Sequence, residues 1–140
     1  MPPPIVNTRR DFLATLAGGV VFTVATQRSA YAVQVSYTAK SGVPTGVCHD
    51  GGHWQVDRNG KEWPVTIQYL ARPKNGTATT RVSTGVRSVY GVSRPVHLTQ
   101  VIYQSRKGFV GEDSFTYRRI TADPTDRLSG TEYAVAVTVR

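Results

Sequence analysis

The sequence predicts an antiparallel β-sandwich, and three features of the 140-residue chain lead to that prediction. Short segments in which apolar and polar residues alternate recur along residues 33–140, as in half-buried strands. Turn signals built from glycine, proline and asparagine separate these segments about every 8–15 residues. No ten-residue stretch of this part has a helical period. We therefore expect an all-β domain of about seven strands in two layers.

The first half of this domain holds two predicted strands and two predicted turns. Residues 33–37 alternate cleanly and predict the first strand, whereas the glycine-rich residues 41–52 predict a loop. The Asn-Gly pair within residues 57–61 is a strong signal for a hairpin turn. Residues 65–70 alternate again and predict the next strand.

The second half is expected to continue in the same way. Residues 73–77 predict a turn that leads into a polar, β-branched run. Residues 84–95 contain two glycines and a proline, which predicts an irregular connection with a short strand inside it. Residues 96–104 have apolar side chains on both faces, as expected of a central strand. Residues 122–130 predict an exposed loop, and residues 131–140 predict the last strand.

The turn and strand that begin at Gly108 hold the centre of the predicted fold. Gly108 and Gly111 can adopt positive φ angles at little cost, so they suit a tight reversal of the chain. Asp113 can cap that reversal by accepting hydrogen bonds from nearby backbone N–H groups. Phe115 and Tyr117 then alternate with polar residues, so we expect both aromatic rings in the core.

The same stretch resembles the signature of bacterial immunoglobulin-like (cadherin-like) modules, reading here Gly108-Phe109-x-Gly111-x-Asp113-Ser114-Phe115-Thr116-Tyr117. Residues 73–77, Pro-Lys-Asn-Gly-Thr, resemble the Pro-x-x-Gly-Thr turn of that family, and Tyr103 holds its aromatic position. Ser105 stands where the family often has proline. The resemblance covers about residues 65–140 and implies an immunoglobulin-like sandwich that serves as a spacer, adhesion or binding unit. It also implies that Phe109 closes the edge of the core.

The first 32 residues predict an export signal. The apolar run of residues 12–25 has about the length of a signal-peptide core and is too short for a membrane span. Ala30 and Ala32 fit the small-x-small pattern that signal peptidase accepts. We expect cleavage of this signal-peptide helix after Ala32, which leaves residues 33–140 with no membrane span. The alternatives are a retained N-terminal anchor or an amphipathic helix that belongs to the fold.

The residues before the apolar run resemble the twin-arginine (Tat) export motif. Arg9 and Arg10 are followed by Phe12 and Leu13, with Ala14 in place of the usual lysine. The resemblance implies a bacterial protein that folds before export to the periplasm or beyond. The Tat machinery and signal peptidase would then be its partners during export.

The charge of the remaining chain limits the classes of partner. Residues 33–140 hold 14 lysines and arginines against 8 aspartates and glutamates, a formal net charge of +6. Such a surface suits another envelope protein or an anionic envelope polymer. The basic residues are spread along the chain without interleaved aromatic platforms, so we expect no nucleic-acid binding.

One short segment could hold a metal. Cys48, His49 and His53 could bind Cu or Zn if the glycines between the histidines allow the loop to fold back. No fourth ligand can be named, and the alternatives are a loop with a free thiol or an intermolecular disulfide. The chain has one cysteine, so an intrachain disulfide is impossible. Three acidic residues lack the spacing of a calcium loop and are expected to cap turns: Asp113, Asp123 and Asp126.

The sequence indicates no enzyme. His97 and Asp50 could join Cys48 in a catalytic group, but no local nucleophile signature accompanies them. We expect an exported, non-catalytic immunoglobulin-like domain that acts as a periplasmic binding, accessory or adhesion module without a cofactor. The alternative is a small metal-binding protein that uses the Cys48 loop. An exposed edge strand would favour partner binding.

Overall fold

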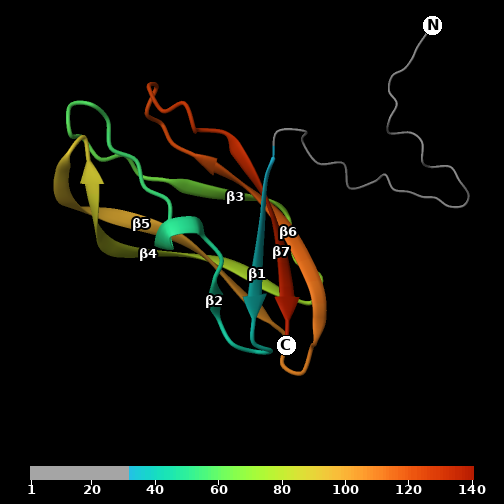
Figure 1. The fold of residues 1–140 in the computed structure, drawn as a ribbon. Coiled ribbons are helices and arrows are strands. Elements are labelled where there is room, and N and C mark those ends of the chain that lie inside the picture. The colour runs from blue at the N-terminus through green and yellow to red at the C-terminus, as the bar shows by residue number, and fades with distance from the viewer. Residues whose placement is uncertain (1–31) are drawn as a thin grey trace, which may run out of the picture. The chain divides into compact units, whose positions relative to one another are not determined.

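The computed structural model describes residues 32–140, which form two β-sheets (Figure 1). The predicted all-β class is confirmed. The four-stranded sheet has the order β1-β7-β6-β3, and the three-stranded sheet has the order β2-β5-β4. The strands are β1 (Val33–Ala39), β2 (Thr45–Gly46), β3 (Thr66–Ala71), β4 (Gly76–Val89), β5 (Val92–Ser105), β6 (Gly111–Ile120) and β7 (Thr131–Val139).

Residues 1–31, which hold all of the predicted export signal except Ala32, lie outside the described part of the chain, and so does the expected helix. The one helical turn in residues 32–140 is a short 3-10 turn, η3 (His49–Gly51). No helix in this part of the chain is long and apolar enough to cross a membrane.

The four-stranded sheet combines both pairing directions. β1 runs parallel to β7 along its whole length, from the pair Val33↔Tyr133 to the pair Ala39↔Val139. β6 is antiparallel to both β7 and β3. The start of β6 therefore lies at the end of β3, next to the turn that leads into β4.

The two sheets face each other across a shared core. Phe115 and Tyr117 of β6, expected in the core from their alternation, are almost completely buried. Tyr103 of β5 stacks on Phe115 with the ring centroids 6.3 Å apart. The remaining buried members of this cluster come from both sheets and from the segment after β2: Ala39, Val47, Ala78, Val101, Val135, Val137 and Val139.

β4 and β5 form one long hairpin, and here the sequence prediction is wrong. Residues 84–95 are not an irregular connection, because β4 and β5 stay paired from Gly76↔Ser105 to Val89↔Val92. Tyr90 and Gly91 form the two-residue turn, with φ angles of 50° and 80°. A tyrosine in the left-handed region is unusual, so the sequence carried no standard hairpin signal.

The glycine and the proline that suggested a break are accommodated within the ladder. A Cβ atom on Gly85 would lie 2.6 Å from the Cδ1 atom of Leu98, so glycine makes room for that leucine. The N–H of Thr99 donates to the carbonyl of His53, which places this N–H on the side away from β4. Pro95, an even number of residues earlier, has its nitrogen on that same side and removes no β4–β5 hydrogen bond.

β5 is the central strand of its sheet, as predicted, and it buries side chains on both faces. Val101 and Tyr103 face the shared core, whereas Val96 and Leu98 belong to a second buried cluster. The odd spacing between Leu98 and Val101 places their side chains on opposite faces of the strand. Trp54 and Val56, which follow η3, and Val89 of β4 complete this second cluster. Residues 41–52, predicted as loop, include the short strand β2.

Candidate functional site

Asp113 joins two turns that are distant in sequence. Its carboxylate accepts hydrogen bonds from the backbone N–H groups of Lys74 (3.1 Å), Asn75 (3.0 Å) and Ser114 (2.9 Å). The buried Tyr103 hydroxyl also donates to it at 2.8 Å, and burial raises the pKa of this hydroxyl. Asp113 therefore caps the turn between β3 and β4, rather than the reversal before β6 as predicted.

The reversal before β6 is made by its glycines and by Phe109. Gly108 and Gly111 have φ angles of 89° and 140°, which favour glycine. Phe109 packs partly buried against the shared core, and the Arg106 guanidinium lies 5.2 Å from its ring centroid. The whole motif from Gly108 to Tyr117 thus serves the packing of the fold.

The structure does not bring Cys48, His49 and His53 together. The Cys48 sulfur accepts a hydrogen bond from the Val101 backbone N–H at 3.0 Å, and His53 Nε2 lies 2.8 Å from the Tyr117 hydroxyl. The His49 side chain is 82% exposed and lies beside the Asp50 carboxylate. Within residues 32–140, no group of three or more His, Cys, Asp or Glu side chains could hold a metal ion.

The protonation of Cys48 and His53 is opposite to that of a catalytic cysteine–histidine pair. Burial raises the pKa of the Cys48 thiol, which keeps it protonated. Burial, and to a lesser degree the charges of Arg119 and His49, lower the pKa of His53 to about 4. A cysteine nucleophile needs a lowered thiol pKa and a basic or cationic partner, so this arrangement disfavours nucleophilic chemistry.

The lowered pKa of His53 predicts a loss of stability in mild acid. His53 resists protonation in the native state but is protonated near pH 6.5 in the unfolded state. The contribution of neutral His53 to the stability of the fold is therefore complete above pH 6.5 and is lost as the pH falls to about 4. The shift corresponds to about 3–4 kcal/mol in the free energy of unfolding. Urea unfolding at neutral and acidic pH should show that His53→Gln loses less stability in acid than the wild type. The glutamine can still form a hydrogen bond with the Tyr117 hydroxyl, so the variant keeps that contact. An equal loss in both proteins would contradict this assignment.

Residues 122–130 form a mostly exposed loop, as predicted, but two of its carboxylates, Asp123 and Asp126, enter a buried polar network. The Arg119 guanidinium forms an ion pair with Asp126 at 2.7 Å, and these side chains are only 3% and 2% exposed. Arg119 also donates to the Trp54 carbonyl, and Gln55 donates to Asp123. The network holds Trp54 and Gln55 against the loop of residues 122–130. The sequence does not indicate this network, because its members come from two stretches, residues 54–55 and 119–126, that are far apart along the chain.

The net positive charge of the domain arises in one continuous stretch. Residues 63–111 contain no aspartate or glutamate, and we call them the acid-free segment. Residues 33–62 and 112–140 hold 7 cations and 8 acids, so the net positive charge comes entirely from this segment. Its seven cations are Arg72, Lys74, Arg81, Arg87, Arg94, Arg106 and Lys107.

None of these cations forms an ion pair with a carboxylate within residues 32–140. The lysine and arginine ion pairs found there are Arg118–Glu132 and Arg119–Asp126, both outside the acid-free segment. Five of the seven cations donate to neutral oxygens instead: Arg72 to Ala78 O, Arg81 to Gln100 Oε1, Arg87 to Val86 O and Asp50 O, Arg94 to Gly60 O, and Arg106 to Asn75 Oδ1. The segment therefore presents positive charge that this domain does not neutralise.

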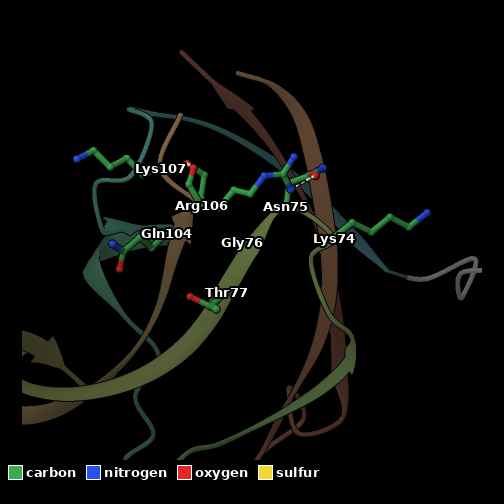
Figure 2. Close-up of a pocket in the computed structure, with 8 residues that line it drawn as sticks. Lys74, Asn75, Gly76, Thr77, Gln104, Arg106 and Lys107 are labelled. Atoms are coloured by element: carbon green, nitrogen blue, oxygen red, sulfur yellow. Dashed lines mark hydrogen bonds between the residues drawn. The ribbon is translucent and has the colours of Figure 1, made fainter. Parts of the chain in front are cut away.

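A polar hollow lies where the β3–β4 turn meets the end of β5 (Figure 2). Residues 74–77 and 104–107 line it. Figure 2 shows the Lys74 and Lys107 side chains pointing away from each other, and Arg106 directed at Asn75. These cations do not converge on one point, so the hollow lacks the geometry of an anion cradle.

β4 forms one edge of the three-stranded sheet, and no other strand in residues 32–140 pairs with its outer side. The N–H groups of Thr99 and Val101 bond to His53 and Cys48, on the side of β5 away from β4. Their β4 partners, Val82 and Thr80, are therefore in non-hydrogen-bonded pairs, with N–H and C=O groups pointing outward. The same alternation turns Thr84 outward.

Arginines cap the outer side of β4 at both ends of this stretch. Arg72 Nη1 donates to the Ala78 carbonyl at 2.8 Å, and Arg87 Nη1 donates to the Val86 carbonyl at 2.9 Å. Between these caps, the outward backbone groups have no hydrogen-bond partner within residues 32–140. We call residues 80–84 the open edge. Val82, at its centre, is 59% exposed.

No protein-family model, curated protein or solved structure matches this chain. A functional assignment consequently depends on the chemistry of the described residues, above all on the open edge and the acid-free segment.

Proposed function

We propose that this protein is an exported, non-catalytic immunoglobulin-like module that binds another protein of the bacterial envelope. The open edge of β4 is the observation that carries the proposal. A partner segment in extended conformation can add to this edge as a further strand, because unpaired backbone groups there are free to bond it.

The order of the strands supports the immunoglobulin-like assignment. In immunoglobulin domains one sheet contains strands B, E and D, and the other contains C, F and G. The orders β2-β5-β4 and β3-β6-β7 correspond to these two sets in chain order. β1, which precedes them, lies beside the last strand. On this assignment the open edge belongs to strand D.

Two further observations favour binding over chemistry at this site. Natural edge strands are usually short or blunted by charge, proline or a bulge, whereas β4 is 14 residues long with a regular register. Arg81 is the one charged residue of the open edge, and Gln100 holds its side chain. The protonation of Cys48 and His53 also supports a non-catalytic role, as does the absence of a local nucleophile signature.

The experiment compares three forms of the full chain produced in a bacterial host with a Tat pathway. The wild type should appear in the periplasmic fraction with Val33 as its first residue, and a protein partner should co-purify with it. Val82→Pro should be exported equally but lose the partner, because proline removes an outward N–H without affecting the β4–β5 ladder. Val82→Thr keeps that N–H and should retain the partner.

Three results would overturn the proposal. Retention of the partner by Val82→Pro would place binding elsewhere on the domain. Cytoplasmic retention of the wild type, or equal export after both Arg9 and Arg10 are replaced by lysine, would remove the export assignment.

A further inference from the structure

We infer that the open edge takes an extended acidic segment of a partner protein, in which acidic residues alternate with β-branched apolar residues. This inference rests on the proposed function and specifies the partner's chemistry. The open edge provides the backbone hydrogen bonds, and the acid-free segment provides the charge that selects the partner.

The arginines at and beside the open edge have no carboxylate partner within residues 32–140. Arg81 lies within the open edge, and Arg72 and Arg87 cap the β4 backbone on either side of it. Each guanidinium has five N–H groups and donates only one or two of them to neutral oxygens within residues 32–140. The remaining donors can bind carboxylates of an added strand, and charge-assisted hydrogen bonds of this kind are the stronger ones.

The alternation follows from the two faces of β4. Val82 and Val86 share one face and are 59% and 63% exposed, whereas Arg81 and Arg87 lie on the other face. Side chains of an added strand lie beside those of the same face on its neighbour. Apolar side chains are therefore expected on the valine face, and acidic side chains on the arginine face, in every second position.

A second copy of this chain fits the open edge poorly. Pairing β4 with β4 would bring arginines of the same acid-free segment together, and like charges on paired strands are destabilising. An anionic polymer without a peptide backbone could use the charge, but it could not use the outward N–H and C=O groups of Thr80, Val82 and Thr84. A polypeptide strand uses both features.

The test measures binding of short synthetic peptides to the exported, processed protein. The probe is the capped heptapeptide Glu-Val-Glu-Val-Glu-Val-Glu, and matched peptides carry threonine or lysine in place of glutamate. We expect the acidic peptide to bind at least about tenfold more tightly than the threonine peptide, and the lysine peptide not to bind. Arg81→Gln should weaken the binding of the acidic peptide several-fold and reduce the salt dependence of that binding.

Two arms test the backbone pairing. Val82→Pro should weaken the binding of the acidic peptide at least about tenfold, whereas Val82→Thr should change the affinity little. An acidic peptide N-methylated at alternate residues should not bind the wild-type protein, which tests pairing without any substitution in the domain. Sedimentation of each variant, alone and with polyphosphate, measures self-association and polymer binding.

The outcomes separate this inference from the proposed function. Equal binding of acidic and threonine peptides, both lost in Val82→Pro, would overturn the acidic assignment and leave strand addition in place. Full binding by Val82→Pro, or by the N-methylated peptide, would overturn strand addition and with it the proposed function. Binding of polyphosphate alone would assign the surface to an anionic polymer, and self-association lost in Val82→Pro would assign it to a second copy. Either result would overturn the inference.

Discussion

Replacing Asp113 with alanine should lower the free energy of unfolding by about 3–5 kcal/mol. The carboxylate accepts four hydrogen bonds, and the alanine variant leaves their donors in place without an acceptor. The Tyr103 hydroxyl would suffer most, because it is completely buried and water cannot replace the lost partner. Urea unfolding of the processed protein measures this loss.

Tyr103→Phe is the matched control, because it removes one donor and leaves the other three bonds of Asp113 intact. Tyr103→Phe should lower the free energy of unfolding by about 1–2 kcal/mol. The Lys74 and Asn75 amides should exchange hydrogen faster in Asp113→Ala and remain protected in Tyr103→Phe. If both variants lost the same stability and kept these amides protected, Asp113 would not hold the β3–β4 turn.

Strand positions could be predicted from the sequence wherever a strand buries one face. Residues 33–37 and 131–140 alternate because β1 and β7 pack one side against the core, and the prediction located both strands. The prediction failed where glycine or proline lies inside a strand for a packing reason. Gly85 accommodates Leu98, and Pro95 has its nitrogen on the side away from β4. Such reasons depend on a partner strand, and a single sequence does not reveal it.

The loop predictions hold for most residues but miss local pairing. Residues 122–130 are mostly exposed, as is usual for polar loops, but Asp126 pairs with Arg119 inside the protein. Residues 41–52 looked like loop because glycine dominates them, yet Thr45 and Gly46 pair with β5. The pairing covers only two residues, too few to produce an alternating pattern.

The candidate site shows what sequence can and cannot provide. The lack of acids in residues 63–111 is visible in the sequence, but the expectation of evenly spread cations overlooked it. The open edge could not be predicted, because it depends on which strand ends the sheet and which backbone groups of β4 point outward. Conversely, Cys48, His49 and His53 are close in sequence, yet they do not share one site. Cys48 and His53 both lie beside the buried Tyr117, whereas the His49 side chain is exposed.

Replacing Arg119 with methionine should lower the free energy of unfolding at neutral pH by about 3–5 kcal/mol. The variant leaves Asp126 charged and buried without its partner, and it also frees the Trp54 carbonyl. Asp126→Leu alone should be costly for the same reason. The double variant should cost about 2–3 kcal/mol less than the sum of the two single variants, because it leaves no buried charge unpaired. Additive losses would contradict a coupled buried pair.

Acid should distinguish this ion pair from simple packing. Burial acts to raise the pKa of Asp126, but hydrogen bonds from Thr121 and Arg119 hold it below its usual value. In the wild type, the stability that comes from charged Asp126 is complete above the pKa that this carboxyl has in the unfolded chain. It is lost as the pH falls through the lower pKa of Asp126 in the native state. In Arg119→Met burial dominates, so protonation relieves the unpaired charge at a higher pH. The difference in the free energy of unfolding between the two proteins should therefore begin to narrow above about pH 4, as Asp126 is protonated in the variant, and narrow further below that pH as the wild type loses stability. A purely steric effect of methionine would stay constant.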